Sequence, residues 1–316
     1  MSTLITNVCH FLGAHLCHRL LSKGESVIGL YHTDAQLSTF EHAANAHHLT
    51  LIKVDLNNIA QVSETFAKTQ PSTVFHFNHF DSSPTHCASA LAQTTNVLEA
   101  SQQTGVKHCL LNSSHAVYLP HQYSAMSVSE LTEHPQSLQG ATARACEMLA
   151  HSYSQVHKLP CTLVRLFEVY GNGADANSLV MQLLEKIKQN DAIDVSSYCQ
   201  DEMDFTYVDD VCNALLRLQE HPAKANPFWA SEGEPVDSSS APWRLYNIGT
   251  GIGTDVSALV QTLAEVCGEK AHVIADQLHS ETKQKQIADV NELVRETAYQ
   301  PRTLLKDGLK QMLTGS

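Results

Sequence analysis

Nineteen of the 316 residues are histidines, and their placement along the chain suggests metal or proton chemistry. Four of them follow predicted strands, where ligand sites form in parallel sheets: His10, His32, His79 and His115. With Cys9 and Glu168 they offer the nitrogen, sulfur and oxygen ligands that suit zinc. The same side chains could instead fill a polar cleft, and no HxxxH spacing on one helix supports a metal. We therefore predict no metal site.

The elements that must position these residues alternate between strands and helices. Apolar runs predict strands at 4–8, 26–31, 49–56, 73–78 and 107–114. Helical spacing and Gly or Pro stops predict helices at 13–24, 63–71, 90–105 and 138–157. This alternation is typical of βαβ units, so we predict an α/β fold with a Rossmann-type, doubly wound parallel sheet. Residues 220–243 are rich in Pro, Ser and Ala and predict a surface insertion.

Composition excludes several classes of protein. Acidic residues exceed Lys and Arg by 13, and without a basic cluster we expect no nucleic-acid partner. No apolar run is long enough to span a membrane, and the N-terminus lacks the features of a secretory signal. Nine scattered cysteines without a CxxC pair indicate reduced thiols, so we expect a cytoplasmic protein.

Several segments together resemble a known family. They include TNVCHFLG at 6–13, NSSHAVY at 112–118, RLFEVYG at 165–171, DFTYVDDV at 204–211 and SSAPWRLYNIG at 239–249. The chain resembles the extended short-chain dehydrogenase/reductase family, in its sugar-nucleotide epimerase/dehydratase branch, and most of all the UDP-glucuronate 4-epimerase group. The resemblance implies a Rossmann domain at 1–170 and a smaller substrate domain at 171–316. Residues 204–220 and 243–250 would return in part to the first domain.

The resemblance also implies a site for NAD, and here the sequence departs from the family. Asn7 and His10 stand where the family's TGxxGxxG turn has glycines, and only Gly13 is kept. Tyr31 replaces the acidic residue that would hold the adenosine ribose, whereas Asp55 matches the position that contacts adenine. Lost hydrogen bonds to charged groups cost ~1.5–3 kcal/mol each. We therefore predict that no cofactor binds tightly and that NAD binding is weak or lost.

The catalytic positions that the resemblance implies are altered as well. The family places a Tyr and a Lys four residues apart on one helix, and these positions are Gln139 and Ala143. Ser114, the third member, remains. A missing general base typically costs ~10²–10⁴ in rate.

The sequence also departs from the family's pattern at the positions that bind the substrate. Its Arg before the DFTY motif is Met203, its Thr near the sugar carboxylate is Glu168, and a further Arg falls at about Asp175. Two of these changes place negative charge where the ligand is negative. A GTGIG run at 249–253 looks like a phosphate loop, but its place after a strand favours a plain turn.

These losses predict a catalytically degenerate relative with a binding, scaffolding or regulatory role in nucleotide-sugar or polysaccharide metabolism. One alternative is a UDP-glucuronate-type NAD-dependent epimerase or dehydratase with a non-standard active site. Another is an enzyme of a different class that uses Ser114, His115 or Glu168. A small-molecule or nucleotide ligand fits each hypothesis. We also expect a homodimer, or a heterodimer with an active paralogue, through the helices at 90–104 and 138–157.

Overall fold

The computed structural model describes residues 2–34, 37, 40, 46–119, 124–195, 202–230, 237–274 and 284–315. The chain forms two compact units. Unit 1 contains residues 1–119, 128–166 and 212–246, and unit 2 contains residues 120–127, 167–211 and 247–316. The predicted domain boundary after residue 170 lies near the change of unit at 166, and it remains a prediction about independently folding domains. Cys199 and part of the predicted insertion lie outside the described residues.

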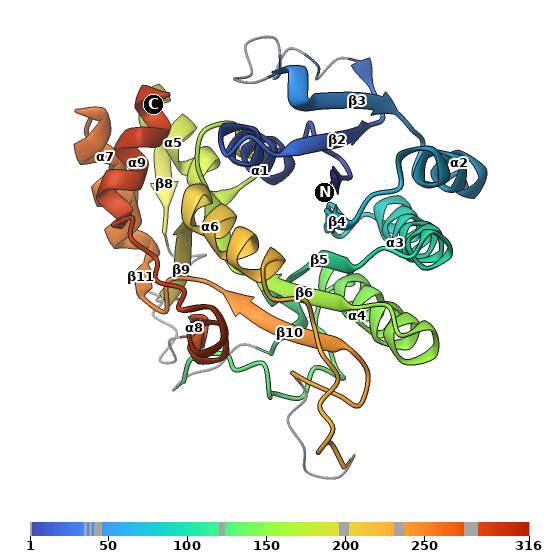
Figure 1. Ribbon diagram of the computed structural model, residues 1–316. Helices are drawn as coiled ribbons and strands as arrows, with labels where there is room; N and C mark the ends of the chain where they lie inside the picture. The colour runs from blue at the N-terminus through green and yellow to red at the C-terminus, as the bar shows by residue number, and fades with distance from the viewer. Residues whose placement is uncertain are drawn as a thin grey trace. The chain divides into compact units, whose positions relative to one another are not determined.

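A seven-stranded sheet forms the centre of unit 1 (Figure 1). In spatial order its strands are β10 (Trp243–Ile248), β6 (Cys161–Leu166), β5 (His108–Ser114), β4 (Thr73–His76), β1 (Ser2–Ile5), β2 (Ser26–Tyr31) and β3 (Leu49–Lys53). Every pairing from β6 to β3 is parallel. The carboxyl ends of these strands therefore meet at one edge, where ligand sites form in such sheets.

Helices cover both faces of this sheet. Helices α2 (Ile59–Thr69), α3 (Pro84–Thr104) and α4 (Leu138–His157) lie on one face, and α1 (Phe11–Ser22) and α6 (Val208–Gln219) lie on the other (Figure 1). The core under α2–α4 is made of fully buried aliphatic and aromatic side chains, among them Leu4, Phe66, Val74, Leu98 and Leu163. This is the predicted α/β Rossmann-type fold, and the prediction is confirmed.

Helix α3 begins earlier than its sequence pattern predicted. The expected start was residue 90, but Pro84 occupies the first turn, where its missing N–H costs nothing. The residues from Pro84 to Ser89 are all exposed or half-buried, and none is a large apolar residue, so their apolar periodicity is weak. The helix ends as predicted at Gly105, which has φ +69°.

Unit 2 contains short strands and four helices. Strands β7 (Glu168–Tyr170), β11 (Gly253–Asp255) and β13 (Lys285–Gln286) all pair with β9 (Glu202–Tyr207), and β8 (Ala192–Asp194) pairs with β12 (His272–Ile274). The helices are α5 (Leu179–Gln189), α7 (Val256–Cys267), α8 (Asn291–Thr297) and α9 (Leu305–Thr314). Between β10 and β11, the GTGIG run forms a turn, as predicted. The backbone N–H groups of Thr250 and Gly251 donate to the buried Asp204 carboxylate, both at 2.8 Å.

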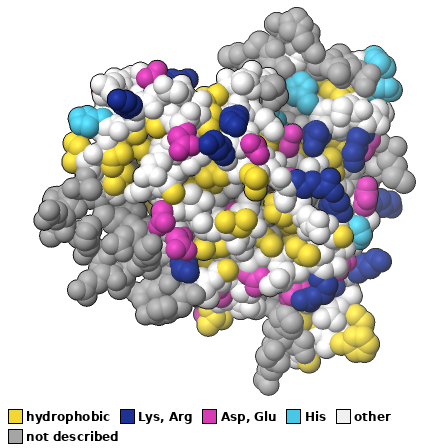
Figure 2. All heavy atoms as spheres, turned by 90° about the vertical axis from the view of Figure 1, so that its left-hand side faces the viewer, with side chains coloured by type: hydrophobic (Ala, Val, Ile, Leu, Met, Phe, Trp, Pro, Cys, Tyr) yellow, Lys and Arg dark blue, Asp and Glu magenta, His cyan; other side chains and the backbone are white. Residues whose placement is uncertain are grey.

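The structure adds three observations on the classes of protein that the composition excludes. No helix among the described residues is long and apolar enough to cross a membrane. Figure 2 shows Lys and Arg side chains interspersed with Asp and Glu over the face that it presents. None of the eight described cysteines forms a disulfide bond with another.

Candidate functional site

A cavity of about 370 Å³ opens in unit 1 at the carboxyl ends of the parallel strands. Polar side chains make up most of its wall: Asn7, His10, His32, Asp55, Asn57, Asn78, His79, His86, Ser89 and Gln93. Leu56 and Ala90 complete it. The structure thus brings together Asn7, His10 and Asp55, three of the five cofactor positions singled out from the sequence.

The turn between β1 and α1 contains one residue in the left-handed conformation. Asn7 adopts the left-handed φ of +49°, and its Nδ2 donates to the carbonyl of Phe77 at 2.7 Å. Asparagine tolerates this conformation better than most residues, so it substitutes for glycine here. A Cβ at Gly13 would lie 2.8 Å from the Asn7 carbonyl, so glycine is required for α1 to approach the turn. His10 is exposed and stands at the N-cap of α1 without a side-chain capping bond.

The next two strands end in the other predicted cofactor residues. Tyr31 is half-buried as the last residue of β2. Asp55 lies in the loop after β3, where its Oδ1 accepts from the backbone N–H of Asn57 at 2.9 Å. That bond holds the Asp55 carboxylate on the cavity wall.

The remnant of the catalytic group lies where β5 meets α4. Ser114 is 7% exposed, and its Oγ accepts from the Ala116 N–H at 3.1 Å and from Gln139 Nε2 at 3.4 Å. Ala143 is fully buried. A Cβ at Gly140 would lie 2.0 Å from the Ala116 carbonyl, so this glycine allows α4 to press against the Ser114 segment. Sequence reasoning missed Gly140, although a glycine in a helix interior is a signal of close packing.

His115 follows Ser114 in a short 3₁₀ turn, His115–Val117. Its Nδ1 lies 3.3 Å from the carbonyl of Leu166. A carbonyl oxygen only accepts, so a hydrogen bond at this contact requires the proton of the half-buried imidazole to be on Nδ1.

A buried ion pair lies beneath the same helix, and sequence reasoning did not anticipate it. Glu147 and Arg165 are 0% and 1% exposed, and two nitrogens of Arg165 donate to the two carboxylate oxygens at 2.8 Å each. Ser113 Oγ donates to Glu147 at 2.6 Å, and Arg144 donates at 3.0 Å. Burial by itself would raise the pKa of Glu147, but attraction to Arg165 and these hydrogen bonds outweigh it, so the pKa is lowered.

The three predicted substrate residues lie in unit 2, which is described by itself. Glu168 opens β7 and is half-buried, opposite Phe205 of β9. Asp175 is exposed, and its Oδ1 accepts from the backbone N–H of Asn177 at 2.8 Å. Met203 is half-buried in β9, opposite Thr254 of β11.

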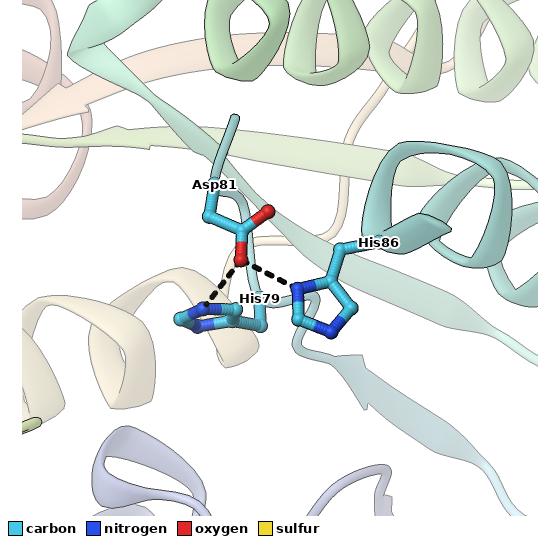
Figure 3. A group of neighbouring side chains, drawn as sticks. All are labelled: His79, Asp81 and His86. Carbon is cyan, nitrogen blue, oxygen red and sulfur yellow. Dashed lines mark hydrogen bonds and ion pairs between the residues drawn. The ribbon is translucent and has the colours of Figure 1, made fainter. Parts of the chain in front are cut away.

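The histidines gather differently from the sequence-based hypothesis. His10, His32 and His79 line the cavity described above, in agreement with the sequence-based hypothesis, but His115 is not among its lining residues. His86 joins them from the first turns of α3, a position that strand-end reasoning could not include. His79 and His86 both meet Asp81, and this trio is drawn in Figure 3.

Comparison with known proteins assigns the family. Residues 4–230 match the model of the NAD dependent epimerase/dehydratase family. The chain belongs to this family. Protein CapI of Staphylococcus aureus is 29% identical over 99% of this chain and 97% of its own length. A probable UDP-glucuronate 4-epimerase of Rhizobium meliloti is 25% identical over 100% of this chain and 92% of its own length.

Solved structures show the same fold. The UDP-glucuronic acid 4-epimerase from Bacillus cereus, in complex with UDP-glucuronic acid and NAD, has a TM-score of 0.82 and 20% identity. The alignment covers 99% of this chain and 98% of that one. The UDP-glucose 4-epimerase of Thermotoga maritima with UDP-glucose has a TM-score of 0.81 and 21% identity, over 99% and 98% of the two chains.

The prediction that the chain binds no cofactor tightly is wrong. The family to which it belongs is NAD-dependent by its description, and the Bacillus cereus neighbour carries NAD. The local geometry explains the error. Asn7 supplies the left-handed turn that the missing glycine would supply, and His10 is an exposed residue at the N-cap of α1. The chain's residues at the β1–α1 turn therefore fit a dinucleotide.

Proposed function

We propose that this protein is an NAD-dependent epimerase or dehydratase acting on a UDP-sugar of the UDP-glucuronate type, with a non-standard active site. The observation that carries the proposal is similarity to a probable UDP-glucuronate 4-epimerase along 100% of the chain. The retained cavity at the sheet edge supports it, because epimerisation at a sugar carbon needs both a cofactor site and a polar reaction site. The described cysteines form no disulfide with one another, which favours the reducing cytoplasm as its compartment.

The chain's own residues supply the binding part. The N-terminus of α1 presents backbone N–H groups and the positive end of its dipole to a diphosphate. Asn7 shapes the turn, and Asp55 offers its carboxylate to an adenine amino group. When bound, NAD accepts a hydride from the sugar and returns it.

Proton transfer needs another group, because Gln139 cannot act as an acid or base at neutral pH. We propose that His115 has this role, because it follows Ser114 directly and its Nδ1 lies 3.3 Å from the Leu166 carbonyl, which orients the ring. Ser114 would position the sugar hydroxyl, and the Gln139 amide would hold the Ser114 hydroxyl in place.

The test is turnover of UDP-glucuronate by the full chain with NAD present, followed by NMR of the sugar products. We expect a UDP-galacturonate signal, and a His115→Gln variant with a rate lower by ~10²-fold or more. His157→Gln, an exposed histidine at the end of α4, should leave the rate unchanged. Bound NAD and bound UDP-sugar without turnover would contradict the proposal.

A second candidate is a catalytically degenerate protein that binds NAD and a UDP-sugar without converting it. The observation that favours it is the pair Gln139 and Ala143 at the Tyr and Lys positions, with Ala143 fully buried. In that case the double variant Gln139→Tyr with Ala143→Lys should gain turnover over the native chain by ~10²-fold or more. A native chain already as active as this variant would exclude the candidate.

A further inference from the structure

Two histidines and one aspartate point at a common centre beside the cofactor cavity (Figure 3). His86 Nδ1 lies 2.5 Å and His79 Nε2 lies 3.5 Å from the same oxygen, Asp81 Oδ2. All three ligand atoms lie within 4.8 Å of one another. The two imidazole rings meet edge to face, with centroids 5.9 Å apart.

The backbone holds the carboxylate of this trio in position. Asp81 Oδ1 accepts the backbone N–H of Ser83 at 2.8 Å, which leaves Oδ2 for the imidazoles. Ser83 is the N-cap of α3, so His86 extends from the first turns of a 21-residue helix. His79 lies in the loop that follows β4, three residues after the strand ends at His76. The loop between β4 and α3 therefore supplies His79 and Asp81, and helix α3 supplies His86.

We propose that His79, Asp81 and His86 bind one divalent transition-metal ion of the zinc class. Two imidazoles and a carboxylate are a preferred ligand set for zinc, with open positions left for water or an anionic ligand. Ligands of a tetrahedral ion at ~2.0–2.1 Å lie roughly 3.3 Å apart, so the His79–Asp81 separation already fits and the His86–Asp81 pair must open by under ~1 Å. The His86 side chain is 56% exposed, so it can make this movement.

The cavity itself gives the ion a role. None of the described residues that line it is Lys or Arg, whereas Asp55 contributes a negative charge. A diphosphate in this cavity would be stabilised only by the positive end of a helix dipole and by hydrogen-bond donors, without a Lys or Arg charge. An ion on His79 and His86, which are both wall residues, would add the missing positive charge. This step rests on the proposed function, and we infer that the ion strengthens binding of the dinucleotide's diphosphate.

The first experiment measures metal alone. The full chain is stripped with a chelator, dialysed and titrated with Zn²⁺ by calorimetry, with metal content checked by mass spectrometry. We expect one tight Zn²⁺ per chain, and a loss of affinity of ~10-fold or more in Asp81→Asn and in His86→Ala. His272→Ala, an exposed histidine of unit 2, is the matched control and should bind as the native chain does. Equal binding by all four proteins would show a merely hydrogen-bonded trio and overturn the site.

The second experiment separates this inference from the proposed function. NAD is titrated into zinc-loaded and zinc-free protein, and we expect affinity to be several-fold higher with zinc in the native chain but not in Asp81→Asn. An NAD affinity that zinc does not change would overturn the coupling while leaving the proposed function standing. Zinc binding without any NAD binding would leave the metal site standing and overturn the proposed function.

Discussion

At the scale of single residues, two buried carboxylates respond to burial in opposite ways. Glu147 meets a full positive charge at Arg165, so its pKa is lowered. Asp204 meets only neutral donors from Thr250, Gly251 and Ala288, so burial dominates and its pKa is raised. Burial alone therefore does not decide whether the pKa of a carboxyl group is raised or lowered. The charge of its hydrogen-bond partners also matters.

The Glu147–Arg165 pair gives the first prediction. Glu147→Gln leaves Arg165 buried without its counter-charge, which costs about 3–5 kcal/mol in the free energy of unfolding. Urea denaturation at pH 7 measures this loss. Glu64→Gln breaks an exposed pair with Lys68 and should give no resolvable change. A Glu147→Gln chain as stable as the native chain would contradict the structural role of the pair.

The pH dependence of this pair follows from its lowered pKa. The stabilisation by ionised Glu147 is fully present above the ordinary carboxyl pKa of 4.5 and is lost as pH falls through the lower, folded-state pKa. The stability difference between the native chain and Glu147→Gln should therefore shrink as pH is lowered below about 4.5. Denaturation curves at a series of acid pH values test this, and a difference independent of pH would refute it.

At the scale of elements, Asp204 joins strands that are distant in sequence. From β9 it accepts the N–H groups of the turn at Thr250 and Gly251, and that of Ala288 at 3.2 Å. These bonds explain why the GTGIG run is a structural turn, since two of its N–H groups are already used within the protein.

The contribution of the Asp204 carboxylate to stability can be tested by removing it. Asp204→Ala leaves several buried donors without an acceptor, at about 1–3 kcal/mol for each group, so we expect a loss of at least ~3 kcal/mol in stability. Because the pKa of Asp204 is raised above 3.8, its ionisation costs stability as pH rises through and beyond 3.8. Asp191→Ala, at an exposed aspartate, is the control. Thermal unfolding with an unchanged midpoint in Asp204→Ala would contradict the stabilising role of the Asp204 hydrogen bonds.

At the scale of the whole molecule, helix α4 carries different residues on two sides. Ala143 and Gly140 are buried, whereas Ala141 and Met148 are exposed, Met148 by 59%. Ala145 continues this outward stripe as a half-buried position, whereas Leu149 packs against the core of unit 1. A stripe of small and apolar residues suits close contact with another helix.

This outward stripe gives the prediction on assembly. We propose that the protein forms a dimer through α3 and α4, either with itself or with a paralogue. Met148→Glu should then yield monomers with an unchanged circular dichroism spectrum, because the residue is not part of the core. His157→Glu, exposed at the end of α4, should leave the dimer intact. Light scattering that finds the native chain monomeric at micromolar concentration would contradict the homodimer.

The sequence by itself determined the alternation of strands and helices, because apolar periodicity and glycine or proline stops are local signals. It also placed Asn7 at a glycine position of the first turn, and the structure gives that residue the left-handed φ of +49°. It could not reveal that His10 is exposed at the N-cap of α1, because the exposure of a side chain depends on tertiary packing. The wrong prediction about NAD arose from that gap.

Only the tertiary structure decided which distant residues meet. Glu147 and Arg165 come from a helix and a strand, and their pairing depends on how α4 packs on β6. His86 reaches Asp81 because α3 begins at Pro84, six residues before its apolar pattern starts. Local patterns record what each segment prefers, whereas a buried ion pair or a ligand cluster requires segments to be packed together. For that reason the fold could be predicted from the sequence, but the histidine cluster could not.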